Sequence, residues 1–131
     1  MIDTDILIDH FHGNSSAQNY IAESLLNGEQ LAISVVTLTE LLAGMRAGEE
    51  VRTESLISLF RLCDVTPDIA RRAGAYLNQY RKSNRLELGD AYIAATAAIH
   101  GAEVVTRNVK HYPMADIAVT EPYQRGAGKG N

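Results

Sequence analysis

The sequence predicts an α/β fold in which a central parallel sheet is flanked by helices on both faces, an α/β/α sandwich. Short apolar runs alternate along the chain with longer segments of helical pattern, which is the order that parallel sheets produce. The run LAISVV at 31–36 is apolar enough to be buried on both faces, as strands of such sheets are. With 131 residues, 46% of them hydrophobic, the chain is long enough for one domain with a substantial core.

The first half of the chain predicts two strands and three helices around them. The first two residues are too few for a full strand by themselves. Residues 15–27 are expected to be helical, because Ser15 and Gln18 make a capping-box pattern at their start and a glycine follows their end. After the strand at 31–36 we expect two helices and then a short strand, at 37–47, 49–61 and 62–65.

The second half opens with the clearest helix start in the chain. Thr66, Pro67 and Asp68 supply an N-cap, a proline at the first helical position and an acid in the first turn. The helix should run to about Lys82. A polar loop then leads to an alanine-rich helix and two strands, at 89–100, 103–106 and 117–119. We predict a single domain over residues 1–124 and a flexible tail over residues 125–131.

The composition of the chain limits the cellular compartments and the binding partners that can be expected. No apolar run approaches the ~20 residues of a membrane helix, and the acidic N-terminus lacks the basic start of a signal peptide. Cys63 is the only cysteine, so an internal disulfide is excluded and a cytoplasmic setting is expected. The net charge of −4 argues against nonspecific nucleic-acid binding. Carboxylates that hold cations are nevertheless not negative in a loaded site, so nucleic acid stays open as a partner.

Four oxygen-bearing side chains stand near predicted strand ends or helix starts. Asp3 follows the first apolar residues, and Glu40 lies in the first turn after the LAISVV strand. Asn108 follows the strand at 103–106, and Asp90 begins the alanine-rich helix. Ligands bind beyond the carboxyl ends of parallel strands, so these residues can meet at one edge of the sheet.

Converging carboxylates predict a metal site. They repel one another unless a cation lies between them, and Mg²⁺ or Mn²⁺ is the cation that oxygen ligands prefer. The sequence contains no GxxxxGK[ST], GxGxxG, HExxH or GxSxG motif. Metal-assisted hydrolysis of a phosphodiester is therefore the enzyme class that best matches the residues present.

Four motifs in order resemble PIN domains, and among them the VapC-type toxins of bacterial toxin–antitoxin pairs. The motifs are IDTDILID, SVVTLTELLAG, LELGDAYIAATAAIHG and VVTRNVKHY, and together they cover nearly the whole chain. The resemblance implies a PIN fold and an endoribonuclease that depends on Mg²⁺ or Mn²⁺ and leaves a 5′-phosphate and a 3′-hydroxyl. It also implies homodimerisation and neutralisation by a VapB-like antitoxin. Relatives begin with a longer first strand, which implies that Met1 is not the natural start.

The resemblance assigns roles to individual residues. It makes Asp3, Glu40 and Asp90 metal ligands and catalytic residues, and it places Asn108 at the fourth acidic position of many PIN domains. An amide oxygen can bind Mg²⁺ but carries no charge, so a second ion should bind weakly or only together with the RNA phosphate. From their own chemistry, Arg107 and Lys110 are expected to hold the RNA backbone.

Other interpretations of the same acids stay open. Asp5 can be an outer ligand or a helix cap, and Asp9 is expected to face solvent. Thr37 and Glu40 also make a capping-box pattern, and Asp90 can cap the alanine-rich helix. Asp116 can substitute for Asn108, and His111 can be a proton shuttle or an exposed loop histidine. Arg107 and Lys110 can also belong to a solvated loop. The basic stretch is expected to be a solvated helix face, with RNA contact as the alternative, and it comprises Arg71, Arg72, Arg81, Lys82 and Arg85.

Two rival functions follow from single features. Asn108 in place of an acid motivates a catalytically silent module that binds RNA or an antitoxin without cleaving. The Asp3-x-Asp5 pair is similar to the start of haloacid-dehalogenase phosphatases. That family has a full apolar strand before the pair, and it has a threonine where this chain has Leu7, so the phosphatase is disfavoured.

Overall fold

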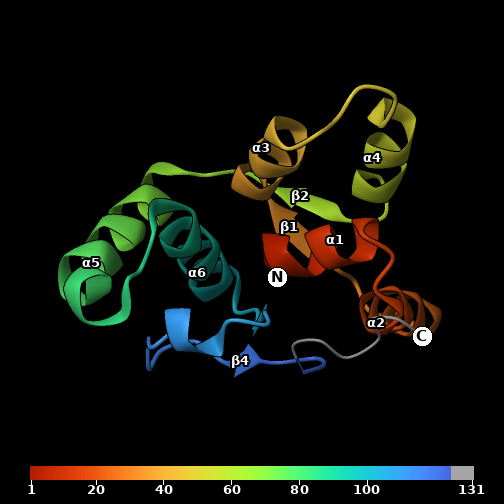
Figure 1. Ribbon diagram of the computed structural model, residues 1–131. Coiled ribbons are helices and arrows are strands. Elements are labelled where there is room, and N and C mark those ends of the chain that lie inside the picture. The colour runs from red at the N-terminus through yellow and green to blue at the C-terminus, as the bar shows by residue number, and fades with distance from the viewer. Residues whose placement is uncertain (125–131) are drawn as a thin grey trace.

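The computed structural model describes residues 1–124, in which parallel strands run between two groups of helices (Figure 1). Two parallel pairs of strands form, β1 with β2 and β3 with β4. The extended first residues join the pairs, because the Ile2 amide donates to the Ala32 carbonyl at 2.8 Å and the Val105 amide donates to the Met1 carbonyl at 2.8 Å. The strands are β1 (Ala32–Ser34), β2 (Arg61–Cys63), β3 (Val104–Val105) and β4 (Val119–Thr120).

The sheet has a separate hydrophobic cluster on each face. Successive residues alternate between them, so that Met1 and Val104 pack in one cluster while Ile2 and Val105 pack in the other. Helices α5 (Pro67–Asn84) and α6 (Leu88–His100) supply the first cluster. The second contains residues of α1 (Thr4–Phe11), α2 (Ser15–Leu26), α3 (Val35–Ala43) and α4 (Glu50–Ile57). The predicted α/β fold with a parallel sheet between helices is confirmed.

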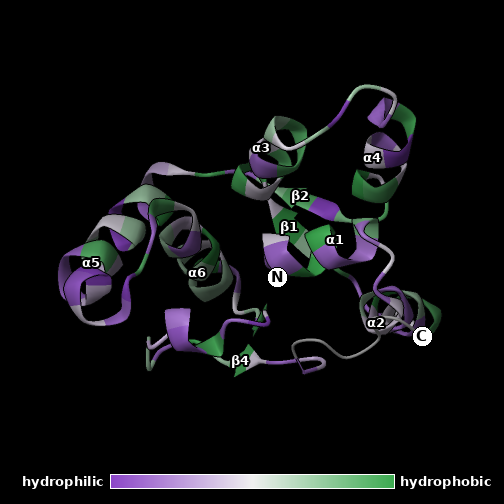
Figure 2. Cartoon of the chain, in the orientation of Figure 1, coloured by the Kyte–Doolittle hydropathy of each residue, from purple (hydrophilic) through white to green (hydrophobic). Residues whose placement is uncertain are grey.

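Helices α5 and α6 pack against each other at one side of the molecule (Figure 1). Buried residues of α6 include Ala91, Ala94, Ala95 and Ala97, whose small side chains let neighbouring elements approach closely. Hydrophilic residues gather instead on the outer side of α5 (Figure 2). The alanine-rich helix is thus an interior element, and it carries the partly buried Asp90 in its first turn.

Capping residues explain where the predicted boundaries differ from the observed ones. The Ser34 hydroxyl accepts from the Val36 amide at 3.0 Å, so α3 begins at Val35 and the expected strand at 31–36 was too long. Asn14 caps α2 by accepting from the Ala17 amide at 3.1 Å, so the capping box predicted one residue later is wrong. The predicted cap at Thr66 is confirmed.

Residues 4–11 form a helix that was not predicted, since the chain turns into α1 directly after Asp3. A short 3₁₀ turn, Val109–His111, follows β3. None of the helices in residues 1–124 is long and apolar enough to cross a bilayer. The tail predicted over residues 125–131 lies outside the described residues, and the single domain over 1–124 stays a prediction.

Candidate functional site

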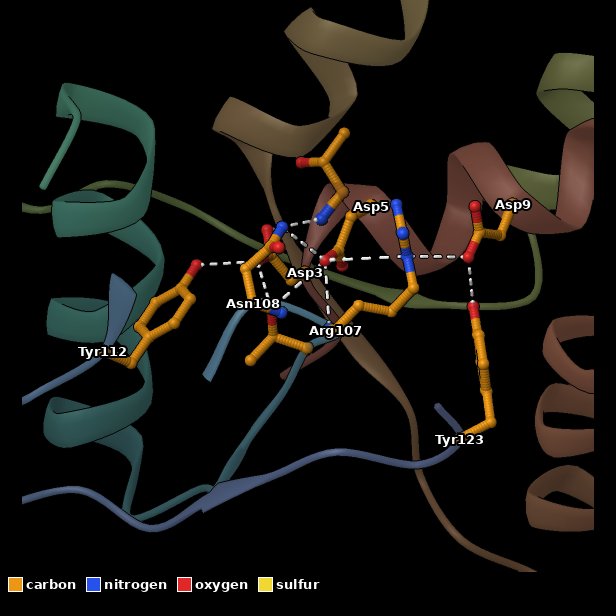
Figure 3. Close-up of polar contacts among 9 residues, drawn as sticks. Asp3, Asp5, Asp9, Arg107, Asn108, Tyr112 and Tyr123 are labelled. Carbon is orange, nitrogen blue, oxygen red and sulfur yellow. Dashed lines mark hydrogen bonds and ion pairs between the residues drawn. The ribbon is translucent and has the colours of Figure 1, made fainter. Parts of the chain in front are cut away.

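Asp3 stands at the carboxyl edge of the sheet, between α1 and the segment after β3 (Figure 3). It is 6% exposed. One of its oxygens, Oδ1, accepts from the Thr4 amide at 2.7 Å, and the other accepts from the Thr106 hydroxyl at 2.8 Å and the Tyr112 hydroxyl at 2.9 Å. Burial raises the pKa of Asp3, because the ionised form loses hydration that these three hydrogen bonds replace only in part.

Asp5 lies beside Asp3 and is held by the same loop. Its Oδ2 accepts from the Arg107 amide and from the Asn108 side-chain nitrogen, both at 3.0 Å. Its Oδ1 is buried and has no hydrogen-bond partner among the described residues. Burial and, next, the charge of Asp3 raise the pKa of Asp5 to about 7. Sequence reasoning left Asp5 outside the main set, and the structure places it within the site.

Asp90 reaches the site from the first turn of α6. Its Oδ2 accepts from the Glu87 amide at 3.3 Å, and the Nδ1 of His111 lies 3.6 Å from the same oxygen. Burial and then the charge of Asp3 raise the pKa of Asp90 to about 6. Asp90 does cap α6, but as the third helical residue of a capping box in which Glu87 is the N-cap, so only the N-cap position predicted for Asp90 is wrong. His111 is partly exposed, as expected, but it faces a carboxylate of the site.

Glu40 approaches from α3. The Thr4 hydroxyl donates to Glu40 Oε1 at 2.8 Å. A methyl group placed on Gly89 would lie 3.6 Å from both Glu40 carboxylate oxygens, so Glu40 lies over the residue that precedes Asp90. Thr37 is fully buried inside α3, and Ser34 is the cap, so the capping box suggested for Thr37 and Glu40 is wrong.

The donor set fits a divalent cation. Among residues 1–124, no three His, Cys, Asp or Glu side chains stand close enough together to hold a metal ion as they are. The buried oxygen of Asp5 nevertheless lacks a donor, and the pKa values of Asp3, Asp5 and Asp90 are all raised. A cation would give the Asp5 oxygen a partner and would reduce the repulsion between the carboxylates. Oxygen donors are the ligands that Mg²⁺ and Mn²⁺ prefer.

Arg107 lies next to α1, where it contacts two aspartates of that helix. Its Nε forms an ion pair with Asp9 Oδ2 at 2.7 Å and lies 4.0 Å from Asp5 Oδ2 (Figure 3). The Tyr123 hydroxyl donates to the same Asp9 oxygen at 2.7 Å. The expectation that Asp9 faces solvent is wrong, since its side chain is 14% exposed. The i, i+4 spacing of Asp5 and Asp9 would have put both on one face, had a helix been assigned there.

Two further predicted residues make no contact with the acids of the site among residues 1–124. Asp116 accepts from Arg72 at 2.9 Å and from the Tyr76 hydroxyl at 2.7 Å, so its side chain is held by α5 and does not substitute for Asn108. Lys110 is exposed in the short turn after β3.

The pair between Asp9 and Arg107 should contribute to stability. We expect Asp9→Asn to lower the free energy of unfolding by about 1–3 kcal/mol, because it removes the nearer of the two carboxylates that pair with a largely buried guanidinium. Tyr123→Phe, which removes one hydrogen bond to the same carboxylate, should cost about 1 kcal/mol. Urea unfolding measures both, and an Asp9→Asn variant as stable as the parent would contradict the role given to this pair.

The fold and these contacts define an α/β/α domain with an acidic centre at the carboxyl edge of its sheet. Residues 1–117 match the PIN domain family, and the chain belongs to this family. Ribonuclease VapC10 of Mycobacterium tuberculosis is 43% identical over 115 residues, covering 87% of this chain and 86% of the relative. Ribonuclease VapC19 of the same organism is 42% identical, with 87% and 92% covered. The family predicted from the four motifs is confirmed.

A solved structure agrees with this assignment. A chain in a toxin–antitoxin complex from Klebsiella pneumoniae superposes with a TM-score of 0.73 at 33% sequence identity. The match covers 94% of this chain and 97% of that one.

Proposed function

We propose that this chain is a divalent-metal-dependent endoribonuclease and the toxin of a toxin–antitoxin pair. The observation that carries the proposal is the group of buried carboxylates at the sheet edge, with raised pKa values and an unpartnered oxygen on Asp5. Relatives at 42–43% identity bear the name ribonuclease VapC, which supports RNA as the substrate.

Asp3, Asp90 and Glu40 would hold Mg²⁺ or Mn²⁺, and Asp5 stands beside them. The ion supplies positive charge against the negative charge that develops on a phosphodiester during hydrolysis. The chain's own groups position the ligands. Thr106 and Tyr112 fix one oxygen of Asp3, and the Thr4 hydroxyl fixes Glu40.

Asn108 is proposed as a weak ligand. Its side-chain nitrogen donates to Asp5 at 3.0 Å, which leaves the amide oxygen as the group that can face a cation. An uncharged ligand at this position agrees with a second ion that binds weakly or only with the RNA phosphate.

Arg107 and Lys110 are proposed to contact the RNA backbone. The ion pair of Arg107 with Asp9 uses Nε, so its two terminal nitrogens stay available for a phosphate. Lys110 is exposed and lies next to His111, which faces Asp90.

A VapB-like antitoxin and a second copy of the chain are the proposed protein partners, and the cytoplasm is the proposed compartment. The similar chain from Klebsiella pneumoniae was solved in a toxin–antitoxin complex, which supports the antitoxin. An acidic centre is also a natural receiver for an arginine of an inhibitor.

Cleavage of a mixed RNA pool by purified protein tests the proposal. We expect cleavage with Mg²⁺ or Mn²⁺ and none with EDTA, and sequencing should find 5′-phosphate and 3′-hydroxyl ends. Products with 2′,3′-cyclic phosphate ends would contradict the mechanism. Folded, antitoxin-free protein that binds RNA and never cleaves it would instead favour the silent module, for which Asn108 in place of an acid is the supporting feature.

A further inference from the structure

The cations of α5 fall into two groups with different partners. In the first turns, Arg71 lies 3.3 Å from Asp68, and Arg72 lies 2.9 Å from Asp116. In the last turn and the cap, Arg81, Lys82 and Arg85 are exposed. None of these three has a carboxylate within ion-pair distance among residues 1–124. The charge at the C-terminal end of α5 is therefore uncompensated, whereas that at the N-terminal end is paired.

This end of α5 adjoins the acidic centre. The Asn84 side chain donates to the Lys110 carbonyl at 3.5 Å, which joins the last residue of α5 to the turn after β3. The next residue along that turn, His111, lies 3.6 Å from an Asp90 oxygen. On the other side, Arg85 takes a left-handed backbone conformation, with φ of 54°, and leads into α6, which carries Asp90 in its first turn.

Exposed cations without carboxylate partners, next to an acidic centre, can bind a polyanion. The chain has a net charge of −4, so a nucleic acid needs local positive charge to approach its carboxylates. Free exposed Lys and Arg side chains can take up a phosphate without breaking an existing ion pair, and phosphate contacts are the main contacts that position a nucleic acid.

We propose that Arg81, Lys82, Arg85 and Lys110 form a basic ridge that binds the phosphate backbone of single-stranded RNA as it enters the site. The proposal rests on the proposed function for the reaction itself. It assigns the paired cations Arg71 and Arg72 no part in this binding. Because cations in the last turn of a helix also stabilise that helix, stability has to be measured alongside binding.

Two matched double variants test the ridge. R81Q/K82Q and R71Q/R72Q each remove two cations from the same helix, and only the first pair belongs to the ridge. Binding of a fluorescent single-stranded RNA is followed by anisotropy in EDTA, which prevents cleavage, between 0.1 and 1 M salt. Melting temperatures of both variants show whether the fold is kept, and R81K/K82R keeps the charge as a further control.

Each phosphate contact on a single strand contributes about 0.7 to the slope of log K against log salt. We expect R81Q/K82Q to lower this slope by about 1.4, which makes its loss of affinity about 25-fold larger at 0.1 M than at 1 M salt. R71Q/R72Q and R81K/K82R should keep the parent slope. With Mg²⁺ present, R81Q/K82Q should raise KM for a long RNA and leave kcat unchanged.

Equal losses in the two double variants would overturn the ridge, since only total charge would then matter. The ridge would also be overturned if R81Q/K82Q bound RNA as the parent does and bound an acidic protein partner more weakly. The surface would then be assigned to that partner. If the parent protein cleaves RNA and both doubles match it, the ridge fails and the nuclease stands. If the parent protein neither binds nor cleaves RNA, both proposals fail.

Discussion

We expect Asp90→Ala to abolish metal-dependent RNA cleavage, with kcat lowered by about 10³-fold or more, because loss of the proposed metal ligand would remove several kcal/mol of charge stabilisation. Asp90 is suited to this role by its position, since its side chain is 18% exposed and the charge of Asp3 helps to raise its pKa to about 6. Cleavage of the RNA pool under saturating Mg²⁺ measures the loss. Calorimetric titration with Mg²⁺ alone should show weaker binding in the same variant.

The variant should remain folded, which separates loss of function from loss of structure. Asp90 gives one hydrogen bond to the start of α6, and its removal costs about 1 kcal/mol as a capping contact. Removing a carboxylate whose charge is disfavoured in the fold offsets part of that cost. Asp64→Ala, at an exposed aspartate outside the site, is the matched control and should keep full activity. Undiminished cleavage by Asp90→Ala would rule out the assigned role of this residue.

The convergence of the acids could be predicted because it follows from strand ends. The residues after a parallel strand emerge at the carboxyl edge of the sheet, so the strand candidates at 31–36 and 103–106 place Glu40 and Asn108 near Asp3. The structure agrees in geometry, with Asn108 bonded to Asp5 and Glu40 bonded to Thr4. Their part in metal binding stays a prediction.

The partners of the acids could not be predicted, because they come from distant parts of the chain. Tyr112 and Thr106 bond to Asp3 across more than a hundred residues, and no periodicity encodes such a contact. Helix α1 was missed for a different reason: its Asp3 cap follows only two extended residues, so the strand and the helix start overlap in the sequence. Without that helix, Asp9 had no reason to share a face with Asp5.

In the metal-free protein, we expect the free energy of unfolding to fall by a few kcal/mol as the pH rises from about 4 to about 7, at about 1.4 kcal/mol for each unit of pKa shift. The pKa of Asp5 is raised to about 7 and that of Asp90 to about 6, from an ordinary value of 3.8. Between the ordinary and the raised values the native state binds more protons than the unfolded state. Stability therefore decreases with increasing pH in that window.

Asp5→Asn isolates this effect, because the amide oxygen can still accept from the Arg107 amide while its nitrogen takes the place of the unpartnered oxygen. We expect a smaller decrease in stability between pH 5 and 8 and a variant more stable than the parent at pH 8. His10, whose pKa is lowered by burial, acts in the opposite direction in both proteins and cancels in the comparison. Urea unfolding in EDTA at pH 5, 6.5 and 8 measures the difference. Parallel pH profiles for the two proteins would mean that Asp5 is ionised without cost, and the raised pKa would then no longer support a cation at this edge of the sheet.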